Sequence, residues 1–332
     1  MLLIILTLLN NDLYQSDTWL VIVNPNAGHR KGRKDWHLIS KLLSDYQIKF
    51  RPFFTEGRKH AIEITDEGIQ KGFRKIIIVG GDGTINEVVN GCFNQKVCPT
   101  TDLILSNITV GTGNDWGRMF GIPSDYEGAI KVIQECRIRQ QDAGVVYYHC
   151  GNEREKRYFI NIAGLGFDAL VVQRTNRQKE RGRNGKAVYL WNLLRSLIAY
   201  KHTYTDVIID GNKISNHTFT ISLGIGRYSG GGMMQTPKAL PDDGLFDITI
   251  IKKMRRRDII RNLKMLYDGT ILKHPLIEGY TGKDICIDSD PIIHLETDGE
   301  ALGHSPIEFR ILPQSINIIY GKYPEWPDEK LN

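Results

Sequence analysis

The sequence lacks any paired-cysteine motif. Its five cysteines, Cys92, Cys98, Cys136, Cys150 and Cys286, are scattered and form no Cys-x-x-Cys pair. An odd number of isolated cysteines argues against a disulfide framework and against a zinc site, and it is typical of free thiols in a reducing compartment. We therefore expect a cytoplasmic protein.

The sequence also lacks a hydrophobic run long enough to cross a bilayer. Residues 1–9, MLLIILTLL, have only about half the length that a membrane-spanning helix needs. They lack the positive stretch and the small-residue cleavage site of a signal peptide. The extension over residues 1–18 therefore has no predicted role.

A large charge excess is absent as well. The chain carries 43 Lys and Arg residues and 38 Asp and Glu residues, which gives a net charge of +5 over 332 residues. This mild excess does not imply nucleic-acid binding, and we expect no nucleic acid as a partner. The length favours two domains over one.

Several well-known catalytic motifs are missing too. The chain has no GxxxxGK[ST] loop, no HExxH and no protein-kinase HRD or DFG motif. Gly111-x-Gly113 and Gly224-x-Gly226 are only fragments of the GxGxxG dinucleotide motif. An ordinary P-loop NTPase is therefore excluded, and a Rossmann dehydrogenase is disfavoured.

The first part of the chain alternates β-branched runs with helical periodicity. This alternation predicts an open, mostly parallel, Rossmann-like α/β sheet. The predicted strands are Trp19–Val23, Ile48–Phe54, Ile76–Val79 and Leu103–Val110, and two of the predicted helices are Trp36–Tyr46 and His60–Lys71.

Polar, glycine-rich loops follow three of these strands, at 24–28, 80–84 and 111–115, and Thr55 follows a fourth. Open parallel sheets bind ligands at the carboxyl ends of their strands, and bare N–H groups at a helix N-terminus suit phosphate. Asp82 would repel phosphate unless a cation lies between them. Taken alone, GGDGT indicates either a phosphate and metal site or a turn that needs glycine for its geometry.

The second part of the chain contains closely spaced short β-rich runs separated by Gly, Asn and Asp turns. This pattern predicts an antiparallel, all-β sandwich or barrel-like domain, interrupted by helices at 185–200 and 257–267. We predict domains over residues 1–140 and 141–320. For the tail, residues 321–332, packing against the first domain is one option.

Acidic residues stand near glycine at several turns of this second part. Gly166-Phe-Asp168-Ala169 is either a tight bend or a functional loop, and Pro241–Asp247 is either a hairpin turn or a divalent-cation loop. Thr297–Glu300 is either a solvated turn or a general base with its supporting acid. The residues alone leave these alternatives open.

Two basic stretches, 174–186 and 252–257, precede amphipathic helices. Each alone is explained by a solvated face. Together they suit docking on anionic headgroups with apolar side chains reaching toward acyl chains.

Seven motifs occur in one order along residues 19–320: Asn24-Pro25-x-Ala27-Gly28, Thr55 with His60-Ala61, GGDGTxNE at 80–87, GTGND at 111–115, GFDA at 166–169, the Asp-Asp-Gly turn and Asp298-Gly299-Glu300. The set closely resembles the soluble bacterial diacylglycerol kinase and lipid kinase family, which shares its catalytic domain with sphingosine kinases. It is more distantly similar to NAD kinases and phosphofructokinases.

The resemblance implies a nucleotide-binding α/β domain, a β-sandwich domain and an active site in the cleft between them, with ATP and Mg²⁺ as cofactors. It implies that the following residues bind the nucleotide: Asn24, Pro25, Asn26, Ala27, Gly28, Thr55, Gly80, Gly81, Asp82, Gly83, Thr84, Ile85, Asn86, Glu87, Thr112 and Asp115.

The resemblance also implies catalytic roles for Glu300, as general base toward the lipid hydroxyl, and for Asp298 and Asp82. Asp82, Asp115, Asp142 and Asp298 match acids around the catalytic magnesium or its hydrogen-bond network. A second, structural magnesium site is implied at Asp243 with the carbonyl groups of Leu240 and Leu245.

We therefore predict an ATP- and Mg²⁺-dependent kinase that phosphorylates diacylglycerol or a related lipid alcohol. It is expected to be cytoplasmic and peripheral to the inner membrane surface, with an anionic membrane as a transient partner and a homodimer as a further option. Two alternatives remain: a kinase of a soluble alcohol such as NAD or of a sphingoid-type base, and a non-catalytic nucleotide-binding protein.

Overall fold

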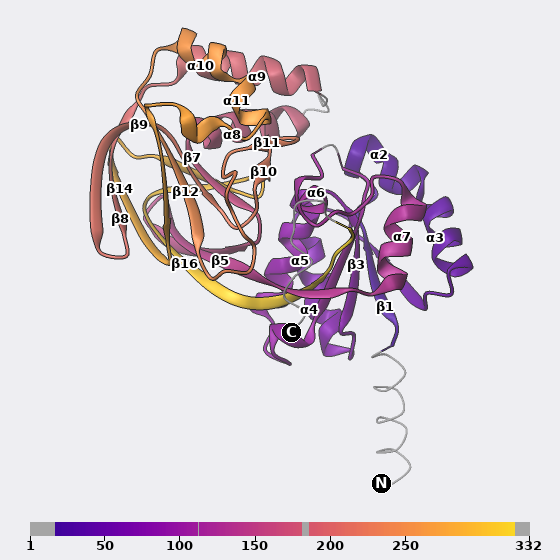
Figure 1. Cartoon of the computed structure of the whole chain (residues 1–332). Helices are drawn as coiled ribbons and strands as arrows, with labels where there is room; N and C mark the ends of the chain where they lie inside the picture. The colour runs from indigo at the N-terminus through magenta and orange to yellow at the C-terminus, as the bar shows by residue number, and fades with distance from the viewer. Residues whose placement is uncertain (1–16, 112, 181–185, 323–332) are drawn as a thin grey trace. The chain divides into compact units, whose positions relative to one another are not determined.

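A computed structural model of the chain describes residues 17–111, 113–180 and 186–322 (Figure 1). These residues form two compact units. Unit 1 contains the described residues up to Gln140 and those from Ile316 onward, and unit 2 contains those from Gln141 to Ser315. No helix in the described ranges has the length and hydropathy that a membrane crossing requires.

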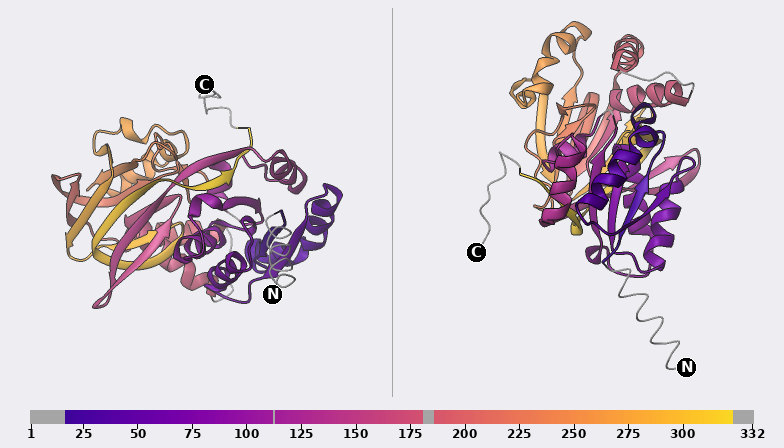
Figure 2. Two further views of the ribbon diagram at one scale, coloured as in Figure 1. Left: turned by 90° about the horizontal axis from the view of Figure 1, so that it is seen from below. Right: turned by 90° about the vertical axis from the view of Figure 1, so that its right-hand side faces the viewer.

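Unit 1 is built on a parallel sheet with the strand order β2–β1–β3–β4–β16. Helices cover both faces of this sheet (Figures 1 and 2). The strands are β1 (Trp19–Val23), β2 (Phe50–Phe54), β3 (Lys75–Gly80), β4 (Ile104–Thr109) and the last residues of β16 (Glu300–Ile319). The helices are α2 (Ala27–Lys34), α3 (Trp36–Asp45), α4 (His60–Gln70), α5 (Asp82–Asn94), α6 (Asp115–Met119) and α7 (Tyr126–Glu135), with a short 3₁₀ turn at Thr100–Asp102.

Burial explains why the central strands of unit 1 are continuous apolar runs in the sequence. Every residue of β1 is buried, and so is every residue of β3 after Lys75. Strands covered by helices on both faces need apolar side chains on both sides. β2 lies at the edge, where Pro52 costs no hydrogen bond to a further strand.

Unit 2 is built from antiparallel strands. Its main path runs β13–β12–β9–β7–β15–β16; β8 joins β9 to β14, β14 also pairs with β16, and β5 pairs with β16 and β6. The strands are β5 (Ile138–Cys150), β6 (Glu153–Phe159), β7 (Ile162–Gly166), β8 (Thr203–Ile209), β9 (Asn212–Gly224), β12 (Phe246–Lys252), β13 (Ile277–Gly282), β14 (Asp284–Asp290) and β15 (His294–Thr297), with a small pair β10 (Tyr228–Ser229) and β11 (Met233–Met234).

The core of unit 2 follows from alternating burial along these strands. Buried and more exposed residues alternate along β8 and through much of β14, as expected for a sheet with one covered face. Aromatic rings fill the centre: Phe159 stacks on Phe246 with 5.8 Å between the ring centroids, and Phe309 meets Phe159 edge-on.

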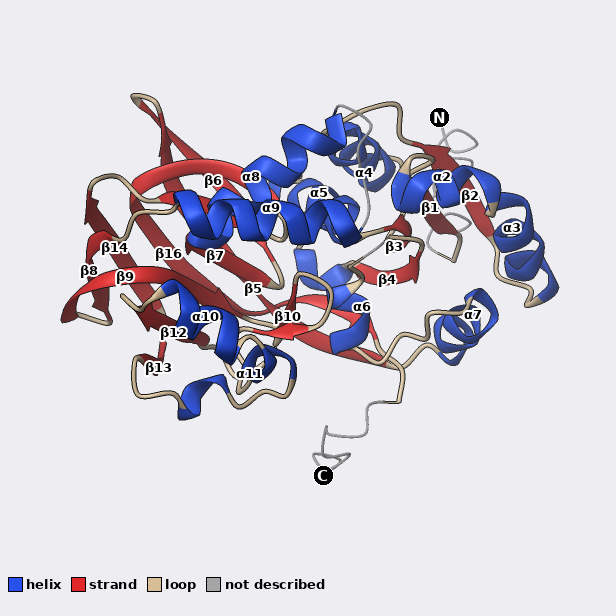
Figure 3. Cartoon of the chain, turned by 90° about the horizontal axis from the view of Figure 1, so that it is seen from above, coloured by secondary structure: helices blue, strands red, loops and turns tan. Residues whose placement is uncertain are grey.

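Four helices belong to unit 2: α8 (Phe167–Glu180), α9 (Lys186–Ala199), α10 (Arg256–Asn262) and α11 (Lys264–Tyr267), with a 3₁₀ turn at Ile271–Lys273 (Figure 3). The structure confirms the α/β first part and the β-rich second part that the sequence predicts. Helix α8 was not predicted, because its apolar residues follow no clear helical period. Residues 316–319, at the end of β16, belong to unit 1.

Candidate functional site

The glycine-rich loops of unit 1 meet at the carboxyl edge of its parallel sheet. A methyl group on Gly111 would lie 2.7 Å from the Cα atom of Gly81, and one on Gly28 would lie 1.7 Å from the carbonyl oxygen of Val110. Gly28 also has a φ of 57°, which favours glycine. The loops after β1, β3 and β4 therefore touch through their backbones.

Side-chain hydrogen bonds connect the first two of these loops. Asn24 Nδ2 donates to Thr84 Oγ1 at 2.9 Å, and its backbone N–H donates to the Val79 carbonyl at 2.9 Å. Asn24 Oδ1 in turn accepts from the N–H of Asn26 at 3.0 Å, and the Asn24 carbonyl accepts from Ala27. Residues 24–27 are thereby held beside the first turn of α5.

The N-terminus of α5 lies where the loops converge. Gly81 is the residue before the first helical turn, and a methyl group on Gly80 would lie 2.6 Å from Thr84 Cβ. The partial positive charge of a 13-residue helix and the glycine backbone suit an anion such as phosphate.

Two acids of unit 1 converge on Gly113. A methyl group placed there would lie 2.8 Å from Asp82 Oδ2 and 3.3 Å from Asp115 Oδ2. The other oxygen of Asp82 accepts from the N–H of Trp116 at 3.2 Å. Burial raises the pKa of Asp82, and backbone N–H groups partly oppose that shift. Two carboxylate oxygens at one point are a donor set that suits a hard cation such as Mg²⁺.

Other predicted nucleotide-binding residues have structural contacts. The Glu87 carboxylate accepts from the N–H groups of Lys59 at 2.8 Å and Ala61 at 3.2 Å, so it organises the start of α4. Ile85 and Asn86 are buried, and Thr55 is buried with its N–H bound to β1. Of the loop residues, Pro25 and Gly83 are partly exposed, and Thr112 lies outside the described residues.

In unit 2, a two-residue turn connects β15 to β16 in front of Glu300. Asp298 and Gly299 have φ values of 48° and 84°, and Thr297 pairs with Glu300, as in a type I′ hairpin. The Asp298 carboxylate accepts three backbone hydrogen bonds, at 3.1 to 3.2 Å, from residues 160–162. These hydrogen bonds hold the β15–β16 hairpin against the residues that connect β6 to β7.

A buried acid that the motifs did not single out lies beside this hairpin. Glu296 Oε2 accepts from the N–H of Gly299 at 2.9 Å. A methyl group on Gly164 would lie 2.6 Å from Glu296 Oε1 and 3.0 Å from Asp168 Cβ, so Glu296 and Asp168 are neighbours. Burial raises the pKa of Glu296 well above its ordinary value, and the charge of Asp168 adds to the shift.

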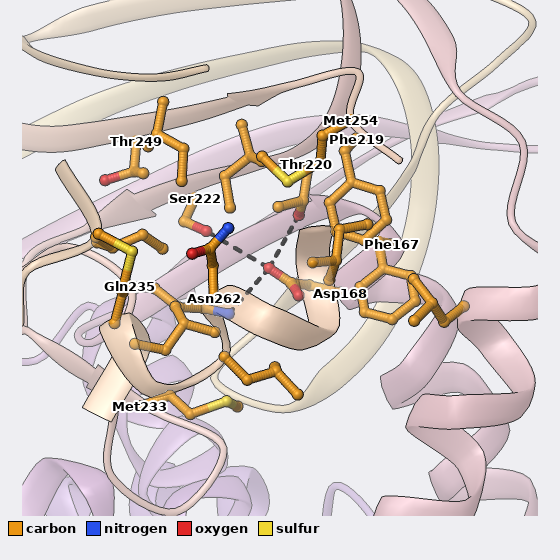
Figure 4. Close-up of a pocket in the computed structure, with 18 of the residues that line it drawn as sticks. Phe167, Asp168, Phe219, Thr220, Ser222, Met233, Gln235, Thr249, Met254 and Asn262 are labelled. Carbon is orange, nitrogen blue, oxygen red and sulfur yellow. Dashed lines mark hydrogen bonds between the residues drawn. The ribbon is translucent and has the colours of Figure 1, made fainter. Parts of the chain in front are cut away.

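A mostly apolar pocket of unit 2 contains Asp168 (Figure 4). Its walls come from helices α8–α11 and from strands β9 and β12. The apolar lining includes Phe167, Val171, Leu193, Leu197, Phe219, Met254, Ile259, Leu263 and Leu266, and the polar lining includes Thr220, Ser222, Gln235, Thr249 and Asn262.

Hydrogen bonds hold the Asp168 carboxyl in this apolar setting. Its Oδ2 atom accepts from Thr220 Oγ1 at 2.9 Å, Gln235 Nε2 at 3.0 Å and Ser222 Oγ at 3.5 Å. Burial raises the pKa of Asp168 to about 6, although these three donors favour the charged form. Gln235 Oε1 is buried without a hydrogen-bond partner among the described residues. Both side chains therefore offer acceptor oxygens to a donor on a bound molecule.

At the loop predicted to hold a structural metal ion, the side chains of Asp142 and Asp243 accept backbone hydrogen bonds. The two oxygens of Asp142 accept from the N–H groups of Gly244 at 2.7 Å and Gln314 at 2.6 Å, so this side chain holds the turn. Asp243 Oδ1 accepts from the N–H of Leu245 at 3.0 Å. The described residues contain no group of three or more His, Cys, Asp or Glu side chains that could hold a metal ion. A cation at this loop would depend on Asp243 and on backbone carbonyls such as that of Leu240.

Two domain families match the chain. Residues 18–146 match the diacylglycerol kinase catalytic domain, and residues 161–320 match the YegS C-terminal NAD kinase beta sandwich-like domain. A diacylglycerol kinase of Staphylococcus epidermidis is 29% identical over 309 residues, which cover 91% of this chain and 92% of that protein.

Two solved structures share the fold. A diacylglycerol kinase from Bacillus anthracis str. Sterne has a TM-score of 0.68 at 23% identity, over 92% of this chain and 97% of that one. Yeast NADH kinase complexed with NADH has a TM-score of 0.53 at 15% identity, over 93% and 85% of the two chains. At these identities the likeness shows the fold alone.

Replacing Asp168 by Asn should stabilise the protein at pH 7.5. The pKa of this carboxyl lies near 6 in the folded chain instead of 3.8, so folding stability is lost as the pH rises from about 4 to about 6 and the loss is complete at pH 7.5. The asparagine variant avoids that loss, and we expect it to gain on the order of 1 kcal/mol. The gain should fall to about half near pH 5 and to about a fifth near pH 4.

Denaturant unfolding of both proteins at pH 4, 5 and 7.5, the span over which Asp168 titrates, measures this gain. The control is Asp206→Asn: a hydrogen bond from Ser215 lowers the pKa of this partly exposed acid, so its removal should give no gain. Equal stability of Asp168→Asn and the parent protein at pH 7.5 would contradict the claim that the buried Asp168 carboxyl lowers stability.

Proposed function

The chain belongs to the diacylglycerol kinase family of lipid kinases, and on this premise we propose that it transfers the γ-phosphoryl group of ATP to the hydroxyl of diacylglycerol or a related lipid alcohol. Unit 1 binds the nucleotide and unit 2 binds the acceptor. The observation that carries the proposal is an apolar pocket with a hydrogen-bonded carboxyl in its wall.

The donor site is supported by the touching loops of unit 1. Phosphoryl transfer depends on positioning and on charge neutralisation more than on covalent help from the protein. Backbone N–H groups at the start of α5 would hold phosphate oxygens, and Asn24 and Thr84 fix the neighbouring loop. The glycines at 28, 81 and 111 allow this close backbone approach.

Mg²⁺ would be held beside the nucleotide by Asp82 and Asp115, whose oxygens converge on Gly113. The ion would supply positive charge to offset the phosphates. A bound cation would also favour the ionised form of Asp82, whose pKa burial raises. We propose a second, structural ion held by Asp243 and the carbonyl groups of Leu240 and Leu245. Asp142, which accepts two backbone N–H groups, would hold the same turn in place.

The acceptor site follows from the chemistry of the pocket. Its apolar walls suit acyl or alkyl chains, and Asp168 with Gln235 suits the hydroxyl end of the same molecule. A soluble acceptor such as NAD would leave most of these walls without a partner. We therefore favour a lipid over NAD, although yeast NADH kinase shares the fold.

Glu300 is the proposed general base that accepts the proton of the acceptor hydroxyl. It directly follows the Asp298–Gly299 turn, and the three backbone hydrogen bonds to Asp298 fix that turn. Asp298 thus acts as a positioning residue in this proposal, and Glu296 supports the same turn through Gly299.

Other expectations from the sequence remain proposals. We propose domains close to residues 1–140 and 141–320, a peripheral association with anionic membranes from the cytoplasmic side, and a homodimer as an open option.

The proposal as a whole is tested by incubating the protein with Mg²⁺, ATP and a total lipid extract and identifying products by mass spectrometry. A phosphorylated neutral lipid supports it, whereas phosphorylation of NAD with no lipid product overturns it.

Replacing Glu300 by Gln should lower kcat by about 10²- to 10⁴-fold, because the amide keeps the shape of the side chain but cannot accept the proton. Binding of ATP and of lipid should stay within about twofold, since neither depends on the base. Glu153→Gln, at an exposed acid of β6, is the control and should keep full activity. Undiminished turnover by Glu300→Gln would remove this residue from the mechanism.

Replacing Gly111 by Ala should weaken Mg·ATP binding by about tenfold or more, because the new methyl group forces the two loops apart. Isothermal titration calorimetry measures the affinity, and a thermal melt confirms folding. Gly57→Ala is the matched control, because no atom lies within 4 Å of its methyl position. Equal ATP affinity of both variants would show that the loops do not bind the nucleotide.

A further inference from the structure

Four exposed large hydrophobic side chains lie on the helices of unit 2, and three of them are the most exposed of that kind among the described residues. Ile198 and Trp191 on α9 are 69% and 63% exposed, Tyr267 on α11 is 54% exposed and Ile260 on α10 is 51% exposed. These four residues define what we call the outer apolar face. Exposed apolar residues are common singly, but a group on adjacent helices indicates an interaction site.

Helical spacing and one hydrogen bond connect three of these residues, Trp191, Ile198 and Ile260. Trp191, Arg195 and Ile198 have the spacing i, i+4, i+7 and all are exposed, so they share one face of α9. Arg256 Nη2 donates to the Ile198 carbonyl at 2.7 Å, which joins the start of α10 to the end of α9. Ile260 follows Arg256 by one helical turn. In Figure 3 α10 and α11 lie next to each other on the same side of the sheet as α9.

Positive charge surrounds this face. Residues 191–201 and 253–268 contain eight Lys or Arg residues and only two acids, Asp258 and Asp268. All eight cationic residues are exposed. Asp258 lies 3.7 Å from Arg257, and Asp268 accepts hydrogen bonds from Thr270. The face therefore combines apolar side chains with an excess of cations.

The same helices are apolar on their inner side as well. Leu193 and Leu197 of α9, together with Ile259 and Leu266 on the segment of α10 and α11, line the pocket that contains Asp168. A surface helix of a globular protein normally has one apolar stripe and a polar opposite face. Apolar residues on both sides are expected where the outer side is covered by a second apolar medium.

We propose that the outer apolar face docks on an anionic lipid bilayer, with Trp191 and Ile198 entering the headgroup region and the surrounding Lys and Arg residues contacting the phosphates. Interfacial helices bind through this combination of apolar area and basic charge. Tryptophan is also enriched at the membrane interface. This inference rests on the proposed function, because the helices that dock also form the wall of the acceptor pocket.

A second copy of the chain is the main alternative occupant. A two-fold symmetric dimer through this face would place each cationic surface against its own copy. Repulsion between like charges disfavours that arrangement, whereas anionic headgroups are complementary to the surface. The positive charge of the outer apolar face therefore favours an anionic bilayer over a second copy of the chain.

The test is co-sedimentation with vesicles of phosphatidylcholine alone and of phosphatidylcholine mixed with phosphatidylglycerol. We expect binding only to the mixed vesicles, weakened by salt. The double variant Trp191→Ser, Ile198→Ser should bind at least about tenfold more weakly. Leu38→Ser, on α3 of unit 1 and 51% exposed in the parent, is the matched control and should bind normally. Arg261→Glu with Lys264→Glu should abolish the preference for mixed vesicles.

Activity separates this proposal from the proposed function. The double variant should phosphorylate a short-chain, water-dispersed lipid alcohol at the parent rate, because Leu193 and Leu197 still line the pocket, and should lose activity only toward acceptors in vesicles. Equal vesicle binding by parent and double variant, or a dimer in sedimentation velocity that the double substitution dissociates, would overturn the docking proposal. An inactive parent that still binds mixed vesicles through Trp191 would overturn the kinase assignment and leave the docking face standing.

Discussion

The close contact between the backbones of Gly81 and Gly111 is the constraint on which the proposed nucleotide site depends. It exists because β3 and β4 run parallel in register, from Lys75 opposite Ile104 to Gly80 opposite Thr109, so both end at the same edge of the sheet. The strand order β2–β1–β3–β4 places the loop after β1 at that edge too. Glycine at these positions lets the three loops touch and leaves N–H groups bare for an anion.

Unit 2 differs from unit 1 because it keeps carboxyl groups in an apolar setting. Asp168 is held by three donors and Glu296 by one backbone N–H, and burial raises the pKa of both. Such groups reduce stability, and their retention is understandable where they serve a bound molecule. A buried acid in an apolar pocket would suit the proposed lipid alcohol, whose two ends differ in polarity.

Much of this architecture could be predicted from the sequence, but the contacts that define each role could not. Glycine-rich loops after buried strands are a local signal in the sequence. The loops after β1, β3 and β4 and the α/β first part were therefore predictable. Glu87 and Asp298 were grouped with the binding and catalytic residues through their motifs, which do not indicate that their oxygens accept backbone N–H groups. The contact between Glu296 and Asp168 joins distant segments of the chain, and so do the walls of the pocket. No short motif indicates either of them. Helix α8 was missed because its apolar positions lack a helical period.

The central claim is that the touching loops of unit 1 bind the triphosphate of ATP. Hydrogen–deuterium exchange with and without Mg·ATP tests it most directly, because bound phosphate slows exchange of the N–H groups that it contacts. We predict slower exchange at residues 24–28, 80–85 and 113–115 and no change in β14. Unchanged exchange in these loops at saturating Mg·ATP, or protection confined to another part of the chain, would contradict the account.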